Sequence, residues 1–212
     1  MKLLSLIFEL TIAKHLLVLY ISLYCKMRVF ISIEFPEEIK NELMFIQKEI
    51  DKLGLIRGKF TEPENIHLTL KFLGEISDIE SRAIKDKLSN IDFSRFYVSF
   101  DKLGVFSESF VRIIWISLKG ESLFELQKKI DSALENIFPK EYQFMAHITL
   151  ARPKFVEDRK ILLDELEKIK VPTKPCLVDK IFIKESVLTG KGPIYKIVQE
   201  INSLEKEQTI IS

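Results

Sequence analysis

The sequence of 212 residues is poor in cysteine, histidine, glycine and proline, and it has almost no excess of either charge. Two cysteines, Cys25 and Cys176, are too few for a disulfide framework or a four-cysteine zinc site, so we expect a reducing, cytoplasmic compartment. Seven glycines and seven prolines exclude collagen-like and low-complexity chains. Because 32 basic residues face 31 acidic ones, a polybasic nucleic-acid binder is excluded, although a small phosphate site is not.

The N-terminal stretch MKLLSLIFELTIAKHLLVLYISLY is more apolar than the rest of the chain. A membrane-spanning helix needs about 20 nearly uninterrupted apolar residues, but Glu9, Lys14 and His15 interrupt this run near its middle. A signal peptide would need an unbroken apolar core and a small-residue cleavage site. We expect that translation starts at Met27 and that residues 1–26 are an extension of the gene model. An ordered extra helix is the second alternative and an amphipathic membrane anchor the third, and we expect no stable membrane partner.

From Met27 onward the sequence alternates between strand and helix patterns. The predicted strands cover residues 28–35, 66–73, 96–105, 111–118, 144–151, 177–188 and 193–201, and the predicted helices cover 36–53, 78–88, 120–134 and 157–169. The order strand, helix, strand, helix, strand therefore occurs twice. We predict one α+β domain over residues 27–201, built from two copies of one unit, followed by a polar tail at 202–212.

Each copy carries a His-x-Thr-Leu tetrapeptide on its second strand, His67-Leu68-Thr69-Leu70 and His147-Ile148-Thr149-Leu150. Because strand side chains alternate between two faces, each histidine shares a face with its threonine, while the aliphatic side chains point into the core. Two such motifs in corresponding elements are hard to assign to chance. If the halves pack about a pseudo-twofold axis, the two polar pairs face each other across one cleft.

Two histidines and two threonines suit acid–base chemistry on a phosphodiester. Imidazole titrates near neutral pH, so one ring can act as the base while the other acts as the acid. Threonine hydroxyls can donate hydrogen bonds to oxygens that gain charge in the transition state. Neither motif contains a serine or cysteine nucleophile, and two histidines without a carboxylate cluster offer too few ligands for a metal.

The motifs resemble the 2H phosphoesterase superfamily, most closely the RNA 2′,3′-cyclic phosphodiesterases, also called 2′-5′ RNA ligases. The resemblance rests on MRVFISIEFP at the start of the domain, HLTLKFLGE from His67, HITLAR from His147 and GPIYKIV from Gly192. It implies two pseudo-twofold-related lobes around a central cleft, each lobe an antiparallel sheet with outer helices.

The resemblance also implies metal-independent hydrolysis of 2′,3′-cyclic phosphates at RNA 3′ ends, without a cofactor, to give 2′-phosphomonoesters. By motif order, His67 corresponds to the proton donor and His147 to the proton acceptor. Thr69 and Thr149 would hold the non-bridging phosphate oxygens, and Arg152 would add a charge-assisted contact to the phosphate. The implied partners are RNA 3′ ends, including transfer RNA fragments, and we expect a monomer.

The alternation of side chains along a strand predicts which neighbours of the motifs face the cleft. Lys71 has the parity of His67 and is predicted to reach the cleft mouth or to be solvated at the strand end, whereas Phe72 has the opposite parity and is predicted to be core. Three aromatic residues are candidates for stacking a terminal base, although packing is the commoner role: Tyr142, Phe144 and Tyr195. Three lysines could line an RNA path: Lys154, Lys191 and Lys196.

Two alternatives to cyclic-phosphate hydrolysis stay open. The same groups could seal or cleave 2′-5′ linkages between transfer RNA halves. The chain could also be a nucleotide-binding module without catalysis, which the intact histidines of both motifs argue against.

Overall fold

A computed structural model describes residues 26–190 and 192–204 of the protein. The predictions for residues 1–25 and for most of the C-terminal tail concern residues outside this range. The strands are β1 (Lys26–Glu34), β2 (Ile56–Phe60), β3 (His67–Ser77), β4 (Phe96–Val105), β5 (Ile114–Lys119), β6 (His147–Val156), β7 (Cys176–Val178), β8 (Lys180–Thr189) and β9 (Gly192–Asn202). The helices are α2 (Glu37–Lys52), α3 (Asp78–Ser89), α4 (Glu121–Leu134) and α5 (Arg159–Lys168), with a 3₁₀ turn at Pro63–Asn65.

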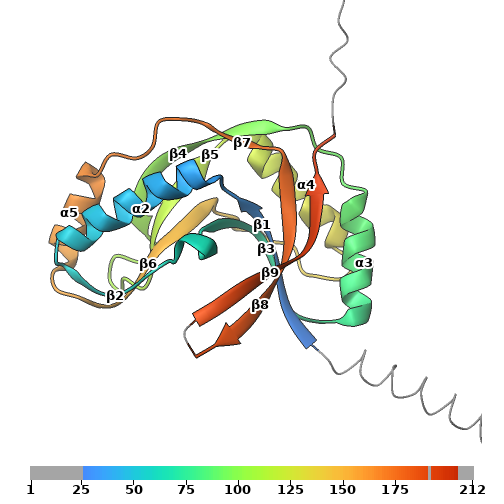
Figure 1. Cartoon of the computed structure of the whole chain (residues 1–212), viewed down its shortest axis with the longest axis horizontal. Helices are drawn as coiled ribbons and strands as arrows, with labels where there is room; N and C mark the ends of the chain where they lie inside the picture. The colour runs from blue at the N-terminus through green and yellow to red at the C-terminus, as the bar shows by residue number, and fades with distance from the viewer. Residues whose placement is uncertain (1–25, 191, 205–212) are drawn as a thin grey trace, which may run out of the picture.

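The strands form two antiparallel sheets, each of which belongs to one lobe (Figure 1). Lobe 1 contains the sheet with strand order β3-β1-β8-β9, and lobe 2 contains the sheet with order β2-β6-β5-β4-β7. The two motif-bearing strands, β3 and β6, lie in different sheets and approach each other where the lobes meet. The predicted α+β fold with two lobes is therefore confirmed.

The lobes do not coincide with the two halves of the sequence. After β1 in lobe 1 the chain crosses to lobe 2, where α2 packs on β6, and after β5 in lobe 2 it crosses to lobe 1, where α4 packs on β3. A buried side chain fixes α2 to lobe 2. The amide nitrogen of Gln47 on α2 donates to the backbone oxygens of Thr61 at 2.8 Å and Leu150 at 2.9 Å. The buried apolar side chains consequently form one cluster through both lobes.

The helices form where their sequences combine an apolar face with a suitable first turn. In α2, Pro36 precedes the first turn, where its missing N–H removes no hydrogen bond, and the buried residues Ile39, Leu43, Ile46 and Ile50 follow at helical spacing. In α3, Ser77 and Glu80 form a reciprocal capping box. These local signals explain why the predicted helices lie within a few residues of the observed ones.

Three predicted strands and one strand that was not predicted require correction. The sequence did not predict β2, because its residues are exposed or half-buried and show no alternation of buried and exposed positions. The single strand predicted over residues 177–188 is two strands, β7 in lobe 2 and β8 in lobe 1, separated at Asp179. The strands predicted at 111–118 and 144–151 begin three residues later than expected, at Ile114 and His147.

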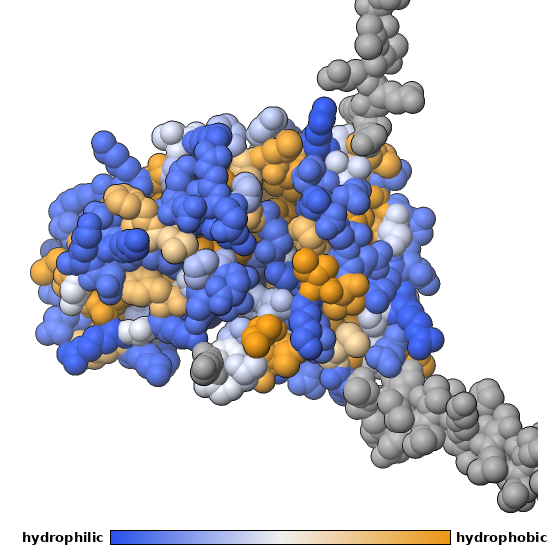
Figure 2. All heavy atoms as spheres, in the orientation of Figure 1, coloured by the Kyte–Doolittle hydropathy of each residue, from blue (hydrophilic) through white to orange (hydrophobic). Residues whose placement is uncertain are grey.

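The face shown in Figure 2 is largely hydrophilic, with hydrophobic side chains at the surface of the β8–β9 hairpin. Leu188, Ile194 and Ile197 are exposed there. No helix in the described part of the chain is both long and apolar enough to cross a membrane.

Candidate active site

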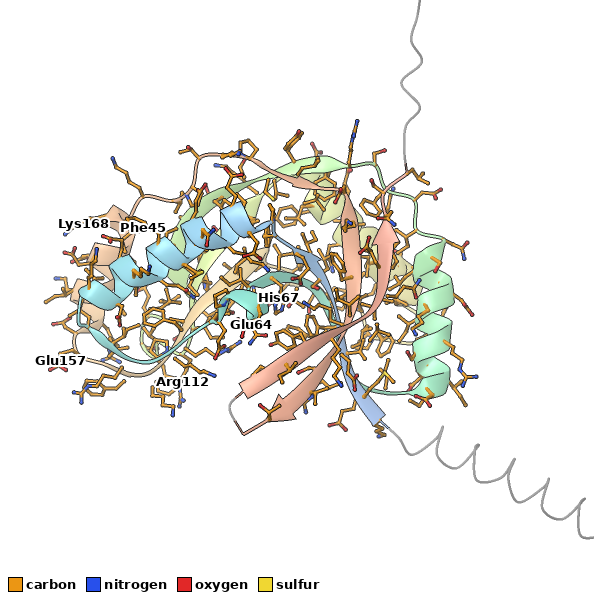
Figure 3. All side chains as sticks on the ribbon, in the orientation of Figure 1. Phe45, Glu64, His67, Arg112, Glu157 and Lys168 are labelled. Atoms are coloured by element: carbon orange, nitrogen blue, oxygen red, sulfur yellow. The ribbon has the colours of Figure 1, made fainter. Side chains whose placement is uncertain are left out.

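Both His-x-Thr-Leu motifs lie at the start of a strand that faces the space between the lobes. His67 and Thr69 are half-buried on β3, as are His147 and Thr149 on β6, whereas the intervening Leu68 and Ile148 are fully buried. The predicted alternation therefore holds over the motifs themselves. Figure 3 shows His67 near the centre of the molecule, between the two lobes.

A cleft of about 710 Å³ brings the two motifs together. All five residues to which the resemblance assigned a catalytic or phosphate-binding role line it: His67, Thr69, His147, Thr149 and Arg152. Residues for which the sequence predicted no role in the site line it as well, among them Arg28, Phe30, Lys59, Glu62, Asn65, Phe72 and Phe106. The sequence could not find these residues because they come from five different segments and share no motif.

The same hydrogen bond orients both imidazole rings. His67 Nδ1 lies 2.7 Å from the backbone oxygen of Asn65, and His147 Nδ1 lies 2.8 Å from that of Met145, in each case two residues earlier. Since a carbonyl oxygen only accepts, Nδ1 is the donor in both rings, and the neutral tautomer carries its lone pair on Nε2. The Thr69 hydroxyl, 3.1 Å away, can donate to Nε2 of His67. Two unprotonated Nε2 atoms are therefore available in one cleft.

The surroundings of both rings favour their neutral form. Burial lowers the pKa of the His67 ring to about 4, with further lowering from the positive charges of Lys184 and Arg152. Burial and Arg152 likewise hold the pKa of His147 below its ordinary value. The cleft therefore presents neutral imidazoles beside cations, an arrangement that favours the binding of an anion.

Aromatic side chains hold the rings from the side. His67 packs edge-on against Tyr195, with ring centroids 5.1 Å apart, and lies 4.9 Å from Phe30. On the other side of the cleft, Phe106 packs edge-on against His147 at 4.9 Å. These contacts restrict the rotation of both imidazoles and keep their Nε2 atoms directed at the cleft.

A β-bulge in each motif strand decides which residues beyond the threonine reach the cleft. In β6, Thr149 pairs with Trp115 and Ala151 with Ile114, so Leu150 is an extra residue. The alternation therefore shifts by one position, and Arg152 joins the face of His147. This is the position that the family resemblance implied for Arg152, although simple strand parity would direct it away from the cleft.

The equivalent bulge in β3 overturns the parity prediction for Lys71 and Phe72. Thr69 pairs with Ser32 and Lys71 with Ile31, so Leu70 is the extra residue. Phe72 lines the cleft with 74% of its surface exposed, whereas Lys71 is buried and points away from the cleft. Both predictions were wrong for one reason: parity assumes an uninterrupted strand, and the leucine that ends each motif is an extra residue in the strand pairing.

Lys71 has a structural role in the described protein. Its ammonium group forms an ion pair with Asp131 on α4 and donates to the backbone oxygen of Pro139 at 2.8 Å. The second oxygen of Asp131 accepts from the backbone N–H of Glu141 at 2.7 Å. This buried network connects β3 to α4 and to the loop that precedes β6.

Of the aromatic and lysine candidates for RNA binding that the structure describes, only one lines the cleft. Among the stacking candidates, Tyr195 lines the cleft, whereas Tyr142 and Phe144 lie beside α4 in a separate depression. Lys154 lies just beyond the cleft and Lys196 does not line it, while Lys191 is outside the described residues. The described residues contain no group of three or more His, Cys, Asp or Glu side chains that could hold a metal ion.

Comparison with known proteins identifies relatives over most of the chain. A family model described as "LigT like Phosphoesterase" matches twice in succession, at residues 33–115 and 116–195. The chain is 36% identical over 179 residues, 82% of its length and 99% of the relative's, to an RNA 2′,3′-cyclic phosphodiesterase of Methanocaldococcus jannaschii. It is 33% identical to the protein of that name from Archaeoglobus fulgidus, over 80% of this chain and 97% of the other.

The comparison with solved structures shows the same fold. The crystal structure of Escherichia coli LigT complexed with 3′-AMP superimposes with a TM-score of 0.67 at 21% identity, over 85% of this chain and all of the other. The two successive matches of one family model also bear out the repeat that the paired motifs indicated.

Proposed function

Because the chain belongs to the LigT-like phosphoesterase family, we propose that it hydrolyses 2′,3′-cyclic phosphates at RNA 3′ ends to 2′-phosphomonoesters. The observation that carries this proposal is the pair of neutral imidazoles that one cleft holds in the same orientation. Hydrolysis of a phosphodiester needs one group that removes a proton from water and another that protonates the departing oxygen. The cleft offers one imidazole for each of these two proton transfers. The two relatives named as RNA 2′,3′-cyclic phosphodiesterases support this substrate.

We assign the roles as the family resemblance orders them. Nε2 of His147 takes a proton from water, the water oxygen bonds to phosphorus, and the bond between phosphorus and O3′ breaks. Protonated His67 gives its Nε2 proton to O3′, so that the product carries a 3′-hydroxyl and a 2′-phosphate. The hydroxyls of Thr69 and Thr149 and the guanidinium of Arg152 stabilise the charge on the non-bridging oxygens.

Because the His67 ring is neutral in the free protein, it must gain its proton when the substrate binds. In the free protein the pKa of His67 is about 4, so its ring is neutral at pH 7. A bound phosphate brings a negative charge next to this ring, which raises its pKa and draws a proton from solvent. Once Nε2 of His67 carries this proton, the Thr69 hydroxyl is free to donate to the phosphate instead of to the ring.

Product analysis tests the proposal directly. An RNA oligonucleotide with a 2′,3′-cyclic phosphate end is incubated with the protein, and the product is identified by its sensitivity to phosphatase and by comparison with synthetic 2′- and 3′-phosphate standards. We expect only the 2′-phosphate. A 3′-phosphate, a joined RNA, or binding of the oligonucleotide without turnover would each contradict the proposed reaction.

The lowered pKa values of His67 and His147 predict that the protein takes up protons when it binds a phosphate. Both histidine pKa values lie below the ordinary value, so at pH 7 the free rings are neutral, and an anion beside them raises both pKa values. We expect a nucleoside 2′-phosphate to bind more tightly as the pH falls from 8 to 6. Calorimetry in buffers of different ionisation enthalpy should detect the uptake of about one proton per ligand. Binding without proton uptake, or weaker binding at pH 6 than at pH 8, would contradict this account of the acid.

A further inference from the structure

A second groove continues the cleft past Arg152, at the end of β6. It has a volume of about 820 Å³ and is lined by the loop before β5, the end of β6 and the start of α5. Arg112 in this groove is followed directly by Ile113 in the cleft, and Lys154 lies two residues after Arg152. In the view of Figure 3, Arg112 projects from the lower edge of lobe 2. We call this surface the β6-end groove.

The β6-end groove has an excess of positive charge, although the whole chain is almost neutral. Its cations are Arg112, Lys154, Arg159 and Lys160, and within the described part of the chain none of them forms a side-chain ion pair. Two of its three acidic residues are already engaged. Glu157 pairs with Arg57 at 3.7 Å, and Asp158 caps α5 by accepting from the N–H of Ile161 at 3.0 Å. With Arg57 included, five cations face three carboxylates, so the excess of positive charge remains.

The same groove exposes two aromatic rings next to arginine side chains. Phe110 is 59% exposed with the guanidinium of Arg112 4.1 Å from its centroid, and Phe155 is 48% exposed with that of Arg57 at 4.7 Å. Basic side chains that contact the backbone, combined with aromatic rings that stack bases, are the means by which proteins bind single-stranded nucleic acid. This combination favours a single-stranded nucleic acid as the occupant of the groove.

We infer that the β6-end groove binds the nucleotides that precede the cyclic end of a single-stranded RNA. This inference rests on the proposed function, because the reacting phosphate fixes which part of the RNA reaches the groove. From His147 to Lys154 the strand advances seven residues, or about 20 Å. At about 3.4 Å per nucleotide, the spacing of fully stacked bases, this distance spans at most about six nucleotides. The preferred substrate is therefore an oligonucleotide rather than a mononucleotide.

The experiment compares substrate lengths in the wild type and in the double variant Arg112→Ala/Lys154→Ala. We expect the wild-type kcat/KM to rise with length, from a nucleoside 2′,3′-cyclic phosphate to an oligonucleotide of about six, and then to level off. In the double variant, kcat/KM for a decamer should fall about tenfold, while kcat/KM for the mononucleotide stays within about twofold. The slope of log kcat/KM against log salt should flatten by about 1.4 for the decamer, since two phosphate contacts are lost.

Lys87→Ala provides the matched control, because Lys87 is an exposed lysine on α3 in the other lobe. It should leave both substrates unaffected. Equal kcat/KM for mononucleotide and decamer in the wild type, or an unchanged length dependence in the double variant, would overturn the inference. If the wild type turns over neither substrate, the proposed function fails, and fluorescence anisotropy with a decamer still tests the groove. Equal decamer affinity of the wild type and the double variant would then refute it.

Discussion

Replacing His147 by alanine is expected to lower kcat/KM for an RNA with a 2′,3′-cyclic end by about 10²- to 10⁴-fold, and replacing His67 to lower it similarly. Each substitution removes one of the proposed proton transfers, while the phosphate contacts proposed for Thr69, Thr149 and Arg152 remain. Substitution of either threonine by valine should cost less, because each removes a single neutral hydrogen bond. Initial rates with a defined oligonucleotide measure these effects. Full activity in both histidine variants would end the proposed mechanism.

A substrate with sulfur in place of O3′ distinguishes the proposed acid, His67, from the proposed base, His147. A thiolate leaves without protonation, so the loss caused by His67→Ala should shrink by at least about tenfold with this substrate. The loss caused by His147→Ala should persist, because water still has to be deprotonated. The opposite pattern would show that the family order of acid and base is reversed in this chain. That outcome would place the acid at His147, although Arg152 opposes a positive charge on that ring as well.

The second large effect concerns stability. Lys71→Met is expected to lower the free energy of unfolding by about 3–5 kcal/mol, because the substitution leaves the Asp131 carboxylate buried without its cation. The Pro139 carbonyl loses a hydrogen bond in the same variant. Urea denaturation followed by circular dichroism measures the change. The loss should occur without any direct effect on the cleft, since Lys71 does not line it.

An exposed ion pair of the same type provides the control. Lys168 lies 2.7 Å from Glu165 on the surface of α5, and Lys168→Met should change the free energy of unfolding by less than about 1 kcal/mol. If the two variants lose the same small amount of stability, the buried network does not connect β3 to α4 as described. Had Lys71 pointed into the cleft, as strand parity suggested, its substitution would mainly have lowered activity.

In the candidate site, the motifs predict the direction of the side chains within them but not of those that follow. The pattern of His67 and Thr69 survives in the structure because alternation along a strand is a local property of the backbone. From the fourth position after the histidine this rule fails in both repeats, because a bulge depends on how the neighbouring strand pairs. For β3 that neighbour is β1, which lies more than thirty residues earlier in the chain.

By itself, the sequence determined the helices, most of the strands and the residue types that the two motifs bring to the site. Helical spacing, caps and alternating strands follow from the residues themselves, and the repeated histidine and threonine motif follows from the duplication. The tertiary structure alone decided which helix covers which sheet, that Phe72 and Arg152 face the cleft while Lys71 is buried, and that the β6-end groove adjoins the cleft. Those outcomes depend on contacts between segments far apart in sequence, and such contacts are settled when the whole core packs at once.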